Sequence, residues 1–119
     1  MAVLVEKDRA AAAAIRENAA QLGVASHIQL LQAPVDKALA TLARGKPQQF
    51  DLIFVDPPYV RVTSPDLAQE LAVCVPWLTG DGVLVLEHGK RDPPPPVPGL
   101  SWDETRAYGD THVSLGIKQ

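Results

Sequence analysis

The stretch FDLIFVDPPY, residues 50–59, decides the fold of this chain. Its first six residues form a nearly continuous apolar run, which is typical of a strand covered on both faces of a sheet. Two consecutive prolines then end the strand, because each proline fixes φ and lacks an N–H donor. We therefore expect a buried strand over 50–55 that stops at a stiff corner.

Apolar runs and helical patterns alternate on both sides of that strand. Further buried strands are expected at 2–5 and 83–87, and a short apolar-rich strand at 27–31. Helices are expected at 9–22, 35–42 and 66–75. An antiparallel hairpin is expected from 102–108 and 112–117, around the turn-like tetrapeptide YGDT at 108–111. This order predicts an α/β fold with a mostly parallel sheet, helices on both faces and an antiparallel C-terminal hairpin.

Short-range signals fix some of the boundaries. Asp8 is the expected N-cap of the first helix, and Gly23 is expected just after its end. The sequence GDG at 80–82 predicts a turn before the strand 83–87. The face of the first helix that is expected to be buried consists of Ala11, Ala14, Ile15, Asn18, Ala19 and Leu22.

Composition excludes several classes of protein. The 119 residues, 46% of them apolar and 21% charged, suit one small globular domain. No apolar stretch approaches the roughly 20 residues of a membrane span, and no signal-peptide pattern opens the chain. A single cysteine and three scattered histidines give neither an internal disulfide nor zinc-ligand spacing. We therefore expect a cytoplasmic protein without a metal.

Ligands of an open α/β sheet bind beyond the carboxyl ends of its strands. The loops expected at those ends are 6–8, 32–35, 56–65 and 87–92. Glu6 directly follows a strand, where a carboxylate can accept hydrogen bonds from both hydroxyls of a ribose. The alternative is that Glu6, Lys7 and Asp8 only solvate a turn and cap a helix.

The corner at 56–59 is the most informative of these sites. The two prolines hold the Asp56 carboxylate, the Pro57 carbonyl and the Tyr59 ring with little freedom. Two converging acceptors suit an amino group with two hydrogens, and an adjacent aromatic ring suits a stacked nucleobase. The alternative is a rigid turn with Tyr59 packed on the core.

Other polar residues carry weaker signals. His88 closes the strand 83–87 beside Glu87, where a single histidine is more often structural than catalytic. Cys74 has apolar neighbours and is expected to pack as a small hydrophobic residue. The cations Arg61, Lys90 and Arg91 either meet phosphates or only keep the loops soluble.

The chain contains four informative segments, VEKD at 5–8, IREN at 15–18, DLIFVDPPY at 51–59 and YGDT at 108–111. Together they resemble the RsmD-type 16S ribosomal RNA guanine-N2 methyltransferases, which have the Rossmann-like class I methyltransferase fold. The tetrapeptide DPPY is similar to the amino-methylating motif of these enzymes. The resemblance covers nearly all of the chain, and DPPY alone is shared with adenine-N6 methyltransferases.

The resemblance implies a cofactor, a partner and roles for particular residues. S-adenosylmethionine (SAM) would be bound through its ribose by Glu6, with Lys7 beside the adenine ring and Ala33, Pro34 and Val35 along its edge. Family members often have an aspartate where this chain has Pro34. Asp56 and Pro57 would hold the target amine, Pro58 would stiffen the corner, and Tyr59 would stack on a flipped guanine. Asp56 would also border SAM, and the partner would be ribosomal RNA or the small ribosomal subunit.

The chain departs from the family pattern at its start. The family has an earlier strand, a Gly-rich loop that cradles the methionine part of SAM, and a basic N-terminal segment. None of them precedes Glu6. We therefore expect residues 1–119 to be the C-terminal two-thirds of one methyltransferase domain. The loss of a basic segment would also explain the net charge of −3, which is unusual for a nucleic-acid binder.

Three alternatives stay open at this point. An adenine-N6 methyltransferase of DNA or RNA shares the DPPY motif. A catalytically inactive fragment with a methyltransferase-like fold would lack the Gly-rich loop. A nicotinamide-dependent oxidoreductase also favours an acidic residue after the second strand, but it has no need of DPPY.

Overall fold

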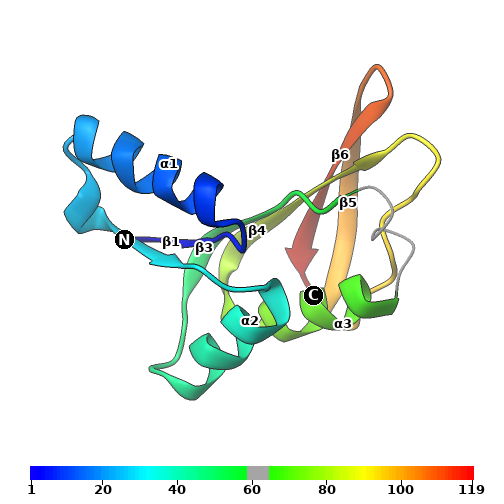
Figure 1. Cartoon of the computed structure of the whole chain (residues 1–119). Helices are drawn as coiled ribbons and strands as arrows, with labels where there is room; N and C mark the ends of the chain where they lie inside the picture. Colours follow the sequence, from blue (N-terminus) through cyan, green and yellow to red (C-terminus); the bar gives the residue numbers. More distant parts are fainter. Residues whose placement is uncertain (59–64) are drawn as a thin grey trace. The chain divides into compact units, whose positions relative to one another are not determined.

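A computed structural model describes residues 1–58 and 65–119 (Figure 1). The chain divides into two units, Met1–Lys46 and Pro47–Gln119, and each unit is described by itself. None of the helices in the described ranges has the length and apolar character of a membrane span.

Unit Met1–Lys46 is built around a parallel pair of strands. The pair consists of β1 (Ala2–Val5) and β2 (Ile28–Leu31), with Val5 opposite Leu31. In Figure 1, α1 runs alongside this pair. The helices of the unit are α1 (Arg9–Gln21), the short 3-10 helix η1 (Ala25–His27) and α2 (Val35–Arg44).

Both predicted ends of α1 are confirmed. The Asp8 carboxylate accepts a hydrogen bond from the Ala11 N–H at 2.8 Å, and Gly23 follows the helix with φ of +71°. The predicted buried face is wrong in part. Ala12 and Ala19 are buried, whereas Ala14, Asn18 and Leu22 are exposed. Seven alanines between residues 10 and 20 make several faces of α1 almost equally apolar, so the pattern could not select one.

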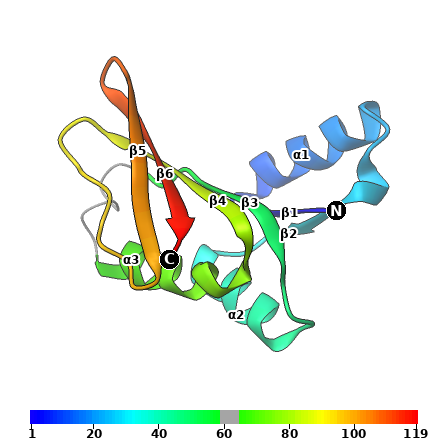
Figure 2. The ribbon, with the colours of Figure 1, turned by 180° about the vertical axis from the view of Figure 1, so that it is seen from behind.

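Unit Pro47–Gln119 contains a four-stranded mixed sheet (Figure 2). Its order is β3-β4-β6-β5, with β3 and β4 parallel and the other neighbours antiparallel. The predicted α/β fold and the C-terminal hairpin are therefore confirmed. The elements are β3 (Phe50–Val55), α3 (Pro65–Cys74), η3 (Val75–Trp77), β4 (Leu78–Gly89), β5 (Leu100–Tyr108) and β6 (Thr111–Lys118).

Strand β4 begins earlier than predicted. Leu78 pairs with Phe50 and Val83 pairs with Leu52, so the residues between them bulge out of register. The predicted turn at 80–82 is thus an irregularity inside a strand. A Cβ atom at Gly82 would come within 3.0 Å of the Phe50 carbonyl oxygen, so glycine permits this close approach.

The two faces of the sheet differ in burial. On one face Leu84 and Leu86 are fully buried, and Leu67 and Leu71 of α3 are buried in the same unit. On the other face of β3, Leu52 is 59% exposed and Phe54 is 62% exposed. The prediction that 50–55 is covered on both faces is therefore wrong. A continuous apolar run has no period, so it cannot report that only one face is covered.

Strand β1 was also predicted to be buried, and this is wrong. Ala2 and Val5 are exposed, and Val3 and Leu4 are half-buried. Within the described residues β1 pairs with β2 alone.

The difference between the sheet faces predicts that two matched truncations have unequal effects on stability. Leu84→Ala should lower the free energy of unfolding by about 2–5 kcal/mol, because it leaves a cavity in the core. Leu52→Ala on the neighbouring strand should change it by less than about 0.5 kcal/mol. Urea titration followed by tryptophan fluorescence measures both, since Trp77 and Trp102 belong to this unit. Equal losses would contradict the assignment of the two faces.

Candidate active site

The carboxyl end of the β1-β2 pair gathers the residues expected to hold SAM. The N–H groups of Glu6 and Ala33 both donate to the Leu31 carbonyl oxygen, each at 3.1 Å. The turn after β1 therefore meets the loop after β2. Pro34, with φ of −58°, stands just before α2, which begins at Val35.

The Glu6 side chain has free acceptor capacity. It is half-buried, and its Oε2 atom accepts one long hydrogen bond, 3.4 Å from the Asp8 N–H. Lys7, Pro34 and Val35 are exposed, and Ala33 is half-buried. The structure thus places all five residues of this unit that are predicted to contact SAM at the carboxyl end of its two strands.

The Pro-Pro corner ends β3 as predicted. Asp56 and Pro58 are exposed, and Pro57 between them is buried. In the described part of the chain, the Asp56 carboxylate has no hydrogen bond or ion pair. Its oxygens are therefore free to accept from a ligand. Tyr59 lies outside the described residues.

The register of β3 and β4 adds a residue to this corner. Val55 pairs with Leu86, so the next positions, Asp56 and Glu87, stand at the same level of the sheet. Glu87 is half-buried, and within residues 1–58 and 65–119 its carboxylate has no partner. Sequence reasoning assigned it no role. The sequence did hold a sign of its position. Asp56 and Glu87 are each the first polar residue after an apolar run, and the two runs are strands that were expected to pair.

His88 belongs to a buried hydrogen-bond chain. It is 2% exposed, with Nδ1 3.0 Å from the Gly89 carbonyl oxygen and Nε2 2.7 Å from Ser114 Oγ. A carbonyl can only accept, so in a neutral ring Nδ1–H donates to it and Nε2 accepts from Ser114. Thr105 Oγ1 lies 2.7 Å from Ser114 Oγ and donates to it. This chain ties β4, β6 and β5 together, which confirms the structural reading of His88.

Two free cations follow β4. Lys90 and Arg91 are exposed, and neither side chain has a partner in the described part of the molecule. The Lys90 N–H donates to the Asp110 carbonyl oxygen at 3.0 Å, so this loop is fastened to the turn of the β5-β6 hairpin. The third cation of the predicted set, Arg61, lies outside the described residues.

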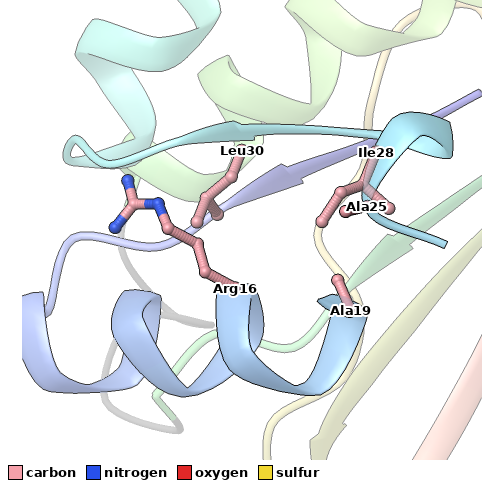
Figure 3. A pocket seen from close by; sticks show the side chains of 5 residues that line it. All are labelled: Arg16, Ala19, Ala25, Ile28 and Leu30. Carbon is pink, nitrogen blue, oxygen red and sulfur yellow. The ribbon is translucent and has the colours of Figure 1, made fainter. Parts of the chain in front are cut away.

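An open pocket lies between α1 and β2 (Figure 3). None of the predicted site residues lines it. The small side chains of two alanines leave the gap, and its one polar side chain, Arg16, lies 3.4 Å from Gln32 Oε1. The lining residues are Arg16, Ala19, Ala25, Ile28 and Leu30.

Solved structures share this fold. A conserved hypothetical protein of Streptococcus pyogenes is 27% identical, with a TM-score of 0.82 over 98% of this chain and 71% of that one. An inferred methyltransferase of Escherichia coli is 22% identical, with a TM-score of 0.78 over 98% and 63% of the two chains. An inferred methylase of Haemophilus influenzae is 19% identical, with a TM-score of 0.74 over 96% and 70%. A comparison with curated proteins found no match.

The fold is thus that of the class I methyltransferases. Residues 1–117 match the family model described as "Conserved hypothetical protein 95", and the chain belongs to that family. This is the family of RsmD-like methyltransferases that the sequence motifs resemble. The chain spans 63–71% of the length of the three relatives above.

The buried Cys74 on α3 gives a pH-dependent prediction. Burial, with a smaller contribution from the charge of Glu70, raises the pKa of the Cys74 thiol from 9.0 to about 11. At pH 8 the folded chain then holds about one hundredth of the thiolate of an unfolded chain, so iodoacetamide labelling should be slower by about that factor. Between pH 9 and 11 the unfolded thiol ionises first, so stability falls as the pH rises.

Cys74→Ala should remove this contribution to the pH dependence. The check is a urea titration of both chains at pH 8, 9, 10 and 11. An identical decline in the two chains, or rapid labelling of the folded thiol at pH 8, would contradict a buried Cys74.

Proposed function

We propose that this protein transfers the methyl group of SAM to the exocyclic N2 amine of a guanine in the 16S RNA of the small ribosomal subunit. The observation that carries the proposal is the corner at Asp56, Pro57 and Pro58, which ends a parallel strand of a methyltransferase fold with an exposed, unpartnered carboxylate. Family membership supports methyl transfer in general.

The proposed chemistry is positioning and electrostatics. A guanine amine is a poor nucleophile, because its lone pair is delocalised into the ring. Hydrogen bonds from its two hydrogens to the Asp56 carboxylate and the Pro57 carbonyl would direct that lone pair at the methyl group. The N–C bond forms as the methyl–sulfur bond breaks, and the amine loses a proton to Asp56 or to water. Tyr59 is proposed to stack on the flipped base.

The residues of the first unit fit the cosubstrate. Bound SAM supplies an electrophilic methyl group on a positively charged sulfur. We assign the ribose hydroxyls to Glu6, whose carboxylate keeps acceptor capacity beside the loop after β2. Lys7, Ala33, Pro34 and Val35 are proposed to border the adenine. With Pro34 in place of the aspartate that is frequent in the family, that edge offers no side-chain acceptor.

The proposed RNA partner needs cations near the acceptor corner. Lys90 and Arg91 follow β4 directly, and their side chains are exposed and unpartnered in the described ranges. We assign them to RNA phosphates, where each contact would add to the salt dependence of binding.

Replacing Asp56 tests the proposal. Asp56→Ala should lower the turnover of methyl transfer to unmodified 16S RNA or small subunits by about 100-fold, because one of two charge-directing acceptors is lost. The SAM dissociation constant, measured by calorimetry, should change by less than about threefold. Asp81→Asn is the matched control, since Asp81 is an exposed carboxylate in the bulge near the amino end of β4.

Two results would contradict the proposal. Equal losses of turnover and SAM affinity in Asp56→Ala would reject its role at the amine. Absence of transfer to any RNA by the unsubstituted chain, together with absence of SAM binding, would favour an inactive protein with a methyltransferase fold.

A further inference from the structure

The two prolines that follow Asp56 offer backbone acceptors and no backbone donors. Pro57 and Pro58 have no N–H group, so the backbone there offers only carbonyl oxygens. The register of β3 and β4 then places Glu87 at the level of Asp56. Two carboxylates and a carbonyl therefore lie at the same level of two neighbouring parallel strands, where β3 ends and β4 continues to Gly89.

Neighbouring groups leave the Glu87 charge unneutralised. Glu87 pairs with Val113 on β6, and Val113 pairs with Arg106 on β5. Arg106 is already engaged, with its Nε 3.1 Å from Glu104 Oε1. Within the described residues Glu87 has no hydrogen bond or ion pair, although it is half-buried. A half-buried carboxylate without a protein partner keeps acceptor capacity that a donor on a ligand can fill.

Guanine and adenine differ in the hydrogen-bonding group that lies next to the exocyclic amine. Guanine presents three donor hydrogens in a row, two on N2 and one on N1. Adenine presents an amine on C6, and its neighbouring N1 carries a lone pair. Three acceptors in a corner therefore match guanine, whereas a carboxylate facing the lone pair of adenine N1 would repel it.

We propose that Glu87 accepts the N1–H of the target guanine and thereby selects guanine over adenine. This inference rests on the proposed function, in which Asp56 and Pro57 accept the two N2 hydrogens. It makes Glu87 a specificity-determining residue of that site. It also separates the proposed reaction from the adenine-N6 reaction of proteins that share DPPY, because only guanine has a hydrogen on N1.

Base analogues test the two carboxylates one at a time. Uridine-rich RNA oligonucleotides with a single central purine are bound to the full chain and followed by fluorescence anisotropy. Hypoxanthine keeps the N1–H and lacks the N2 amine, whereas 2-aminopurine keeps the amine and lacks the N1–H. The missing O6 of 2-aminopurine affects all variants alike, so ratios between variants report the N1–H.

Glu87→Gln should reduce the preference for guanine over 2-aminopurine by roughly tenfold, because a charge-assisted hydrogen bond becomes a neutral one. Its preference for guanine over hypoxanthine should stay within about twofold of the unsubstituted chain. Asp56→Ala should show the reverse pattern. Asp81→Asn should change neither ratio.

The outcomes separate this inference from the proposed function. If Asp56→Ala abolishes the preference over hypoxanthine while Glu87→Gln leaves the 2-aminopurine ratio unchanged, the role of Glu87 is overturned and the amine site stands. If the unsubstituted chain shows no preference for guanine over any of the other purines, both are overturned.

Discussion

The parallel pairing of β3 with β4, with Val55 opposite Leu86, is the constraint on which the candidate site depends. It is held in place by the burial of Leu84 and Leu86 on one face of the sheet, and Gly82 lets the two strands stay close where the register shifts. This register brings Asp56, which follows β3, to the level of Glu87, the first polar residue after the apolar run of β4. The same geometry recurs at the β1-β2 pair, where Glu6 and Ala33 share one carbonyl oxygen. Each unit thus presents polar groups where the first strand of a parallel pair ends.

Interactions between nearby residues made the ends of several helices and strands predictable from the sequence. The double proline stops β3 whatever surrounds it, and Asp8 and Gly23 limit α1 through backbone conformations and hydrogen bonds that involve only nearby residues. The hairpin turn at 108–111 was recognisable for the same reason, since Gly109 adopts φ of +66°. The corner at Asp56 and Pro57 was predictable as a structure for the same reason, and the roles of its acceptors stay a proposal.

Features set by distant contacts were not predictable. The exposure of Leu52 and Phe54 depends on what covers one face of the sheet, which an apolar run does not encode. The buried position of His88 requires Ser114, which lies 26 residues further along the chain. Glu87 comes to the level of Asp56 only through the register of two strands, and the residues between those strands give no local sign of it.

In the proposed reaction, selection of a guanine amine by the acceptors of the corner at Asp56, Pro57 and Pro58 determines which nucleoside is methylated. Its most direct test is to incubate the full chain with SAM and unmodified small-subunit RNA, and to identify the methylated nucleoside by mass spectrometry after complete digestion. We expect N2-methylguanosine as the product, formed by the unsubstituted chain and strongly reduced in Asp56→Ala. N6-methyladenosine as the product would contradict it, because adenine N1 would then face the Glu87 carboxylate.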